Sequence, residues 1–519
     1  MIMIDIQFSR KKLYDESAQG LTVFCRQDAV ESDPMIEECA SRFYKPLKQL
    51  MRDRNFTGKA GDTLVVSAVR QDRPITLIFI GLGNTTVRED MLEQYRRALG
   101  SMIRTAEKLK IDTLACPLIK PESLTVSTRE LVQETTATTL MAHYQFRDFF
   151  TQPDKTETQD IILTLCMQEA DFDEADHGRT IGLRIGHAVN QARYWDDLPG
   201  NHLTPTLFAE HMRNIAQTHD LTLTVLGKTE LCSLGMGGIC AVGQGSIEEP
   251  RMVIMEYHAE NKNAPVIALV GKGITFDTGG ISIKPSGGME AMKDDMAGAA
   301  AVVSTIAAIS HLKPSVNVIA LAPLAENMPS GTATRPGDII RFYNGTTAEV
   351  KNTDAEGRLI LADALAYAAK NYKPDIMIDI ATLTGACIYA LGPFFAGLLS
   401  RHDALAESIL ASGCRTGDRC WRLPMTDDYR AAIKSDVADI CNTGNEKYRA
   451  GTITAGFFLS NFVGDTTWAH LDIAGTSYNV PDRSYYRSGG TGFGVRLLID
   501  LIMNYSKENR QIHNENKHD

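Results

Sequence analysis

Two hydrophobic patterns alternate along the chain. Short apolar runs occur at residues 63–68, 75–80 and 160–166, and residues 90–110 carry apolar side chains three or four positions apart. Short apolar runs predict strands, whereas a spacing near 3.6 residues predicts amphipathic helices. The alternation of the two patterns predicts an α/β fold.

The pattern also predicts two domains, because 519 residues exceed the roughly 250–300 at which a single core stops growing. Residues 179–195 keep helical spacing up to Leu198, Pro199 and Gly200, which end a helix. Beyond them, nearly continuous runs of Val, Ile and Leu are typical of parallel strands covered by helices on both faces. Those strands are expected at 266–270, 316–321 and 375–380, with helices at 296–312 and 358–371. We therefore expect a smaller N-terminal α/β domain at 1–170, an interdomain helix at 171–197, a larger C-terminal α/β domain with a mainly parallel central sheet at 198–505, and a polar tail at 506–519.

The composition argues against several classes of function. Hydrophobic residues make up 44% and charged residues 23%, as in ordinary globular proteins. The net charge of -11 disfavours a general polyanion binder, because phosphate contacts need clustered Lys and Arg, although it leaves room for a local basic patch. The N-terminus has no secretory apolar region, and no run approaches the roughly 20 apolar residues of a membrane helix. We therefore expect a cytoplasmic protein without a membrane partner.

The common sequence signatures of zinc and nucleotide sites are missing. Ten cysteines lack a C-x-x-C pair, which predicts reduced structural thiols, and twelve histidines form no H-E-x-x-H or H-x-H cluster. Gly81 and Gly83 lack the third glycine of a dinucleotide loop, so we interpret them as a tight strand-to-helix turn without a cofactor. Gly273 follows Lys272 where a P-loop needs Ser or Thr. Any metal is therefore expected to be held by oxygen ligands or by an unusual set.

Four acidic residues lie where a parallel sheet binds ligands. Asp277 follows a predicted strand, whereas Asp295 and the pair Asp354 and Glu356 precede predicted helices. Ligands bind beyond the carboxyl ends of parallel strands, so these acids could meet in one cleft. Their mutual repulsion would be cancelled by two divalent cations, as in hydrolases whose metals lie roughly 3.5–4 Å apart. The alternative is that Asp295 and Asp354 only cap helices.

The segments around these acids resemble the signatures of the leucine aminopeptidase (cytosol aminopeptidase) family, in its bacterial form. They read VGKGITFDTGG at 270–280, MKDDMAGAA at 292–300 and NTDAEGRL at 352–359, and the last is highly specific. Further similar blocks, which extend the resemblance over most of the chain after about residue 192, lie at 326–330, 381–385, 435–439, 451–455 and 468–475. The resemblance implies a hydrolase, a metalloprotease that releases leucine or other medium apolar residues from peptides with a free N-terminus.

The resemblance also implies a dinuclear centre of two Mn2+ or Zn2+ ions. Asp277 and Glu356 would bridge the ions. Lys272 and Asp295 would complete the tighter site, and Asp354 would complete the more exchangeable one. A lysine ligand must be a neutral amine, which is reasonable when a cation sits directly on its nitrogen.

The implied catalytic pair is Lys284 and Arg358. With the carboxylates offset by two dications and Lys272 neutral, these two are the cationic groups left for a developing oxyanion. In the implied mechanism, one metal binds the amino group of the peptide, and the other metal and Lys284 polarise the scissile carbonyl, which a metal-bridging water or hydroxide attacks. Arg358 would orient a bicarbonate that serves as the general base.

The implied pocket for the N-terminal side chain is formed by Met292, Thr382, Leu383 and Ala474. A flexible Met beside a small Ala suits medium apolar side chains, although each residue alone would more often be core. Two positions depart from the family's wording. Residues 490–495 read GTGFGV in place of an ATGRPV-like run, and Asp197 stands where asparagine is common. We expect the departures to affect the pocket rim and not the metal site.

Two other functions are compatible with the resemblance. Some bacterial relatives also bind DNA in transcription or recombination, and a hexamer can align grooves that the charge of one chain hides. The acidic balance disfavours this as the main role. A non-catalytic scaffold or storage protein is the third possibility, against which the complete set of ligands argues. The resemblance further implies a homohexamer with the C-terminal domains at its centre.

Overall fold

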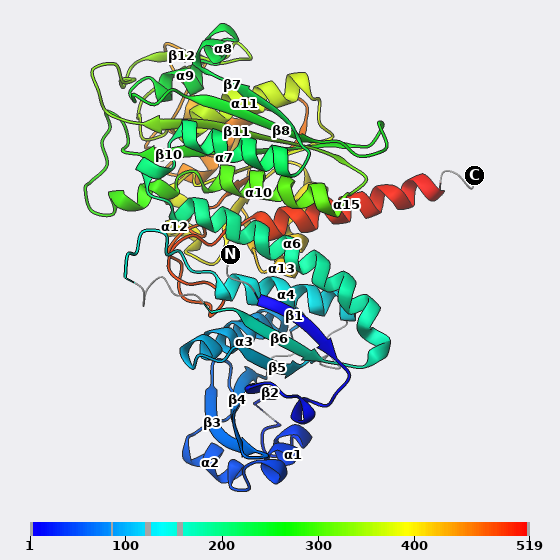
Figure 1. Cartoon of the computed structure of the whole chain (residues 1–519). Helices are drawn as coiled ribbons and strands as arrows, with labels where there is room; N and C mark the ends of the chain where they lie inside the picture. Colours follow the sequence, from blue (N-terminus) through cyan, green and yellow to red (C-terminus); the bar gives the residue numbers. More distant parts are fainter. Residues whose placement is uncertain (1–3, 28, 85–86, 120–125, 153–158, 516–519) are drawn as a thin grey trace. The chain divides into compact units, whose positions relative to one another are not determined.

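The computed structural model describes residues 4–27, 29–84, 87–119, 126–152 and 159–515 (Figure 1). The chain divides into two compact units. Unit 1 comprises Met1–Asn190 and Asp482–Arg487, and unit 2 comprises Gln191–Pro481 and Ser488–Asp519. Each unit has a sheet of its own.

Unit 1 is built on a six-stranded sheet in the order β1-β6-β5-β2-β4-β3. Its neighbouring strands are parallel, except that β3 and β4 are antiparallel. The strands are β1 (Ile4–Ser9), β2 (Gly20–Arg26), β3 (Thr63–Arg70), β4 (Arg73–Gly83), β5 (Thr113–Pro117) and β6 (Ile161–Cys166). The helices include α1 (Pro34–Arg42), α2 (Leu47–Asp53), α3 (Arg88–Lys108) and α4 (Thr128–His143).

The burial of these strands follows their place in the sheet. β2 lies inside the sheet and is buried along nearly its whole length, whereas the edge strand β3 alternates exposed and buried residues. Alternation is expected where one face packs on the core and the other meets water. The predicted strands at 63–68, 75–80 and 160–166 thus correspond to β3, β4 and β6, and the helix predicted at 90–110 to α3.

Unit 2 contains a nine-stranded sheet in the order β16-β15-β18-β14-β9-β11-β8-β7, with β10 paired to β11. The central strands β18, β14, β9 and β11 are parallel, which confirms the predicted mainly parallel α/β fold. Toward the edges, β15, β8 and β7 run antiparallel to their inner neighbours. The strands are β7 (Thr222–Leu226), β8 (Arg251–Tyr257), β9 (Val266–Gly271), β10 (Gly273–Asp277), β11 (Asn317–Asn327), β14 (Ile376–Ala381), β15 (Ala396–Leu399), β16 (Cys420–Arg422) and β18 (Thr467–Asp472). A small sheet joins β12 (Ile339–Arg341), β13 (Thr347–Glu349) and β17 (Ile440–Cys441).

Helices of unit 2 pack on this sheet, as Figure 1 shows for α10 (Ala297–Leu312) and α11 (Gly357–Asn371). α10 is buried on nearly all sides because it contacts β9, β11 and β14 as well as α15 (Val495–Glu515). A Cβ on Gly298 would lie 2.1 Å from the carbonyl oxygen of Ile380, so only glycine permits this close contact between helix and sheet. The other helices are α7 (Pro205–Thr218), α8 (Lys228–Ser233), α9 (Gly237–Gly243), α12 (Gly385–Leu391), α13 (Asp403–Thr416) and α14 (Gly451–Leu459).

The burial of α10 bears on the membrane prediction. Contrary to the sequence-based expectation, Met289–Leu312 is long and apolar enough to cross a membrane by length and composition, yet 83% of its apolar window is buried inside the protein. Burial to this extent is typical of a helix in the core of a protein. An all-round apolar helix is typical of a core as well as of a membrane span, so composition alone does not separate the two.

Helical structure continues through two polar stretches of the chain. α6 (Phe172–Asp197) starts within the acidic stretch before residue 179, where Asp173 and Glu174 stand in its first turn. Acidic side chains there complement the helix dipole. α15 runs on to Glu515, into the segment expected to be a polar tail, of which residues 516–519 lie outside the described part.

Candidate metal centre

The predicted metal ligands meet at the carboxyl ends of the parallel strands of unit 2. Lys272 directly follows β9, and Asp277 is the last residue of β10. Asp295 lies between the short 3-10 helix η4 (Met289–Asp294) and α10, and Glu356 directly precedes α11. These four side chains are buried, whereas Asp354 is partly exposed.

Lys272 lies at the centre of one half of the site. Its Nζ is 2.6 Å from Asp295 Oδ1 and 2.8 Å from Glu356 Oε1, and it donates to the carbonyl oxygen of Thr382 at 2.9 Å. A Cβ on Gly357 would lie 2.5 Å from Cε of Lys272 and 2.7 Å from its Nζ. The glycine of the NTDAEGRL run therefore leaves the space that the lysine side chain fills.

Lys284 joins the other two acids. Its Nζ lies 2.8 Å from Asp277 Oδ2 and 2.5 Å from Asp354 Oδ1. Between Asp277 and Lys284 the chain turns through Gly279 and Gly280, whose φ angles are 87° and 65°. Other residues rarely adopt such angles, so the two glycines allow the turn that returns Lys284 to Asp277.

The carboxylates fit a divalent metal. Asp277, Asp354 and Glu356 each offer a ligand oxygen, and these oxygens lie within 4.8 Å of one another. Asp295 Oδ2 and Glu356 Oε2 are buried without a hydrogen-bond partner among the described residues. A buried polar atom without a partner is costly, and a bound cation would satisfy both oxygens. Carboxylate oxygens suit hard and borderline divalent ions such as Mn2+ and Zn2+.

The pKa shifts show that negative charge is crowded at this site. Burial raises the pKa of Asp295 well above its ordinary value, even though Lys272 opposes the shift. Burial, followed by repulsion from Glu356, raises the pKa of Asp277. Burial lowers the pKa of Lys272, but the carboxylates of Asp295 and Glu356 outweigh it and the net shift is upward. Each shift has the sign expected when carboxylates are packed together out of water.

Arg358 lies in the first turn of α11 and is also buried. Its Nη1 donates to the carbonyl oxygen of Asn442 at 2.7 Å, and its Nε has no partner among the described residues. Burial lowers its pKa to about 10, although Glu356 and Asp472 oppose the shift. The guanidinium therefore retains an unsatisfied donor, which could bind an anion.

Two of the predicted pocket residues are held by one carboxylate. Leu383 follows β14 and Ala474 follows β18, and these strands are parallel neighbours. The backbone N–H groups of both residues donate to Asp472 Oδ1 at 3.2 Å. Asp472 thus fixes the two loops relative to each other.

The other two predicted pocket residues lie next to the predicted metal ligand Asp295. Thr382 Oγ1 donates to Asp295 Oδ1 at 2.7 Å, and Met292 lies in η4, three residues before Asp295. All four predicted pocket residues are partly exposed, as a binding surface requires, and their role stays a prediction.

Sequence reasoning missed two asparagines that position the predicted ligands. Asn327 Nδ2 donates to Asp277 Oδ1 at 2.8 Å. Asn442 accepts from the backbone N–H of Lys351 at 2.8 Å and donates to the carbonyl oxygen of Asn352 at 2.7 Å. Asn327 lies in the family-like block at 326–330, which was the available signal, whereas Asn442 lies just beyond the block at 435–439.

The two departures from the family pattern lie in contact with each other. The backbone N–H of Gly490 donates to Asp197 Oδ1 at 2.9 Å, and Arg193 Nε donates to the carbonyl oxygen of Gly490 at 2.9 Å. A Cβ on Gly489 would lie 2.3 Å from Asp197 Oδ1. The replacement at 197 and the altered run at 490–495 therefore form one local structure.

Comparison with known proteins gives matches for both units. Residues 190–499 match the model of the cytosol aminopeptidase family, catalytic domain, and residues 22–153 match that of its N-terminal domain. A probable cytosol aminopeptidase of Roseiflexus castenholzii is 42% identical over 466 residues, which cover 89% of this chain and 94% of the relative. A probable cytosol aminopeptidase of Geobacter sp. is 40% identical, over 96% of this chain and 99% of the relative.

Solved structures are similar over most of their length. The bottromycin maturation enzyme BotP in complex with Mn has a TM-score of 0.79 at 34% identity, over 88% of this chain and 96% of that one. A mutant of tomato leucine aminopeptidase has a TM-score of 0.87 at 28% identity, over 97% of both chains.

Proposed function

This chain belongs to the cytosol aminopeptidase family and is a metal-dependent aminopeptidase, and on that premise we propose that it removes leucine and other medium apolar residues from the N-termini of peptides. The observation that carries the proposal is the acidic cluster with two buried, unpaired oxygens, Asp295 Oδ2 and Glu356 Oε2. We propose that two divalent cations, Mn2+ or Zn2+, are held there by Lys272, Asp277, Asp295, Asp354 and Glu356. The similar enzyme BotP was solved in complex with Mn, which supports the choice of metal.

Lys284 is the proposed electrophile of the reaction. Bound divalent cations supply positive charge that polarises a carbonyl and lowers the pKa of water. With 22% of its side chain exposed, Lys284 is the more accessible of the two lysines at the site, so its ammonium can reach the scissile carbonyl oxygen of a peptide. Its contacts with Asp277 and Asp354 hold the ammonium beside the acids. Preorganised positive charge of this kind stabilises a developing oxyanion.

Arg358 is the proposed anchor of a bicarbonate that acts as the general base. Its free Nε–H and its charge would bind one end of the anion, while Asn442 fixes the orientation of the guanidinium. The N-terminal side chain of the substrate would contact Met292, Thr382, Leu383 and Ala474, which are small or apolar apart from the Thr hydroxyl. That hydroxyl is already engaged by Asp295, so the pocket presents mostly apolar surface.

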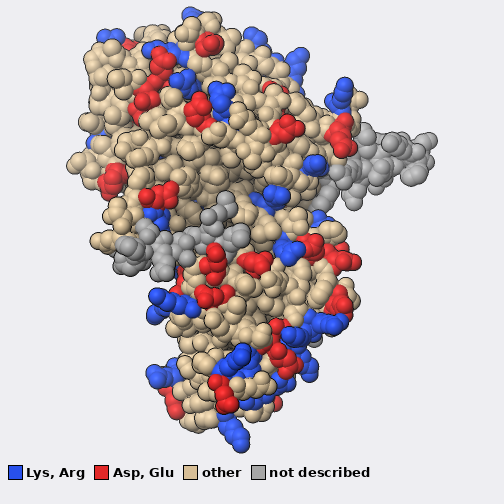
Figure 2. Space-filling model, in the orientation of Figure 1, with Lys and Arg blue, Asp and Glu red and all other residues tan. Residues whose placement is uncertain are grey.

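We propose that the enzyme acts in the cytoplasm. The relatives are named cytosol aminopeptidases, which supports a cytoplasmic location. We also propose a homohexamer, as the family resemblance implies. An accessory DNA-binding role has less support, because the chain carries a net charge of -11 and Figure 2 shows Lys and Arg interspersed with Asp and Glu on the face drawn. A salt-sensitive gel shift that survives Glu356→Ala would establish that role.

Hydrolysis of an unblocked leucyl amide tests the proposal. The purified protein is assayed with Mn2+, with Zn2+ and with chelator, beside Glu356→Ala, Lys284→Met and Asp338→Asn. Asp338 is a matched control because it is a carboxylate that pairs with Arg335 at 3.0 Å and is not one of the proposed ligands. We expect metal-dependent turnover that is lost in the first two variants, kept in the control, and absent on the N-acetylated substrate. Lack of turnover with either metal in a folded protein would overturn the assignment.

A further inference from the structure

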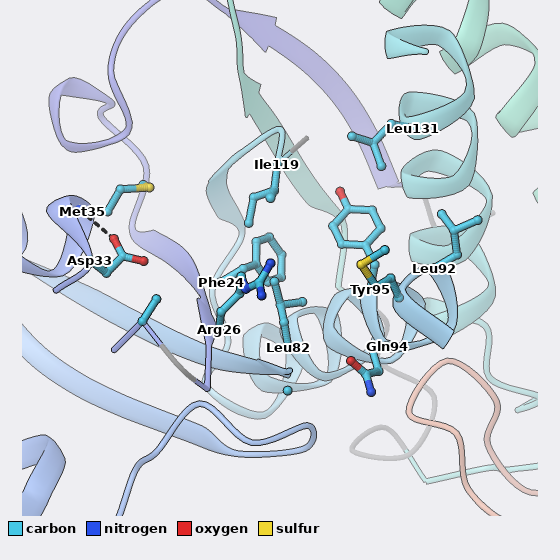
Figure 3. Close-up of a pocket in the computed structure, with 13 residues that line it drawn as sticks. Phe24, Arg26, Asp33, Met35, Leu82, Leu92, Gln94, Tyr95, Ile119 and Leu131 are labelled. Atoms are coloured by element: carbon cyan, nitrogen blue, oxygen red, sulfur yellow. Dashed lines mark hydrogen bonds between the residues drawn. The ribbon is translucent and has the colours of Figure 1, made fainter. Parts of the chain in front are cut away.

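Unit 1 contains a cavity that the proposed peptidase site does not use. Its volume is about 220 Å3, and residues of unit 1 line it (Figure 3). Phe24 and Arg26 lie at the end of β2, Leu82 and Gly83 at the end of β4, and Ile119 just after β5. In open α/β sheets, ligands bind beyond the carboxyl ends of the strands.

The cavity lies where the connections of the sheet change direction. After β2 the chain forms β4 and β3 on one side, and α3 then leads it back across β2 to β5 and β6 on the other side. Such a change of direction opens a crevice at the strand ends. The turn at Gly81–Gly83, which the sequence predicts to be only a tight connection, forms part of the cavity wall through Leu82 and Gly83.

The inner walls are mostly apolar and aromatic. Tyr95 and Leu92 come from α3 and Leu131 from α4, and Phe24 packs on Tyr95 with ring centroids 5.9 Å apart. The hydroxyl of Tyr95 is hydrogen-bonded to Thr135 Oγ1 at 2.9 Å, so the phenol has no need of a ligand. A volume of about 220 Å3 exceeds the roughly 150 Å3 of a cavity that holds benzene and is smaller than the roughly 300 Å3 of sites for drug-sized ligands. The space therefore fits a ligand with one apolar side chain.

Two opposite charges line the same cavity. Arg26 supplies a guanidinium, and Asp33 supplies a carboxylate at the N-terminus of α1. Asp33 Oδ1 accepts from the backbone N–H of Met35 at 2.8 Å, while its Oδ2 accepts no hydrogen bond from the described residues. Figure 3 shows Asp33 and Met35 on one side, Leu131 and Tyr95 on the other, and Phe24 and Arg26 between them. An anion, a cation and an apolar group are thus all accommodated by one small space.

We infer that this cavity binds a free apolar α-amino acid, such as leucine, methionine or phenylalanine. The carboxylate of the amino acid contacts the guanidinium of Arg26, and its ammonium contacts the carboxylate of Asp33. Its side chain occupies the space between Phe24, Tyr95 and Leu131. The inference rests on the proposed function in one respect, because an aminopeptidase of that specificity releases amino acids of this class.

Equilibrium dialysis with radiolabelled L-phenylalanine tests the inference in the full-length protein. A Glu356→Ala background weakens binding at the peptidase site, so that the number of ligand molecules bound in unit 1 can be measured. In that background, Ile119→Trp fills the cavity, and Arg26→Gln removes the positive charge. Asp33→Asn removes the negative charge but keeps an oxygen that caps α1. Val69→Trp, at a position on β3 that is 63% exposed, is the matched control for an added indole.

We expect one phenylalanine bound per chain, no binding in Ile119→Trp, and affinity at least tenfold lower in Arg26→Gln and in Asp33→Asn. N-acetylphenylalanine and phenylalaninamide, each of which lacks one charge, should bind at least tenfold more weakly than the amino acid. Binding that is equal for the three ligands, or unchanged in all three cavity variants, overturns the inference, as does no binding at millimolar ligand. Leucyl amide hydrolysis by the unit 1 variants in the otherwise native chain separates the two proposals. If the cavity binds no amino acid, that activity is still present.

Discussion

Gly357→Ala is expected to impair the proposed metal site although it adds only one methyl group. The new Cβ would lie 2.5 Å from Cε and 2.7 Å from Nζ of Lys272, which is closer than carbon and nitrogen atoms pack. A flexible lysine usually moves away from such a clash. Here its Nζ is held by Asp295, Glu356 and the carbonyl oxygen of Thr382 at 2.6, 2.8 and 2.9 Å.

The expected size of the effect follows from opposing contributions. Alanine in a helix is favoured over glycine by about 1 kcal/mol. Overpacking a buried site costs about 1–3 kcal/mol, and losing one hydrogen bond to a charged group costs about 1.5–3 kcal/mol. Because the costs exceed the gain, the metal-free protein should lose about 1.5–5 kcal/mol of unfolding free energy. If Lys272 leaves the proposed metal site, the affinity for the metal should fall at least tenfold.

Denaturant titration of the metal-free protein, together with elemental analysis of protein dialysed against graded Mn2+, measures both effects. Gly385→Ala is the control, since Gly385 is also the first residue of a helix, and a Cβ there would meet no atom within 4 Å. If Gly357→Ala keeps the metal content and stability of the native chain, Lys272 is not confined as described, and the reasoning from its three contacts is wrong.

Three further perturbations have expected outcomes. Removing the metals with chelator should lower the unfolding free energy. The expected loss is about 2.7 kcal/mol, relative to protein at a free metal concentration a hundredfold above Kd, and calorimetry with and without chelator measures it. Asp418→Ala should destabilise unit 2 by about 3–5 kcal/mol, because Asp418 pairs with the buried Arg496 at 2.6 Å. Urea titration measures the loss of unfolding free energy, and a loss below about 1 kcal/mol would contradict the reasoning. Burial lowers the pKa of His470, but the Asp379 carboxylate at 2.5 Å outweighs it, and the net shift is upward from 6.5. A histidine whose pKa is higher in the folded state than in the unfolded state stabilises the fold. This stabilisation is complete at a pH below the unfolded-state pKa, and it is lost as the pH rises through the folded-state pKa. His470→Gln should therefore flatten the decline of unfolding free energy above pH 6.5, as measured by urea titrations at several pH values, and an unchanged slope would exclude this pair as its source.

The sequence predicts the fold class and the place of the candidate site, because both depend on local patterns. Apolar runs predict the parallel strands. Because ligands bind at the carboxyl ends of such strands, the sequence also predicts that Asp277 and Asp295 lie at the site. Strand direction at the edges of the sheet was not predictable, because an apolar run reads the same whether its neighbour is parallel or antiparallel. β8 and β15 are examples.

The contacts that support the site could not be predicted from the sequence pattern either. Asn327 and Asn442 act through hydrogen bonds to segments far away along the chain, and a single asparagine carries no periodic signal. The apolar run of α10 was underestimated for a related reason. Its residues are interspersed with Gly, Ser and Thr, which are tolerated in a buried helix.

The proposed metal ligands are far apart along the chain, and this separation has a consequence for biosynthesis. Lys272 and Asp277 emerge from the ribosome well before Asp354 and Glu356, and α10 and β11 lie between the two groups. A zinc finger can bind its ion as soon as a few closely spaced ligands exist, so that the ion drives folding. Here the ligands converge only after β9, β10 and β11 have paired and α11 has docked on them. A metal at the proposed site is therefore expected to enter a chain whose sheet is already formed, and a chain released before Glu356 is added would lack one of the proposed ligands.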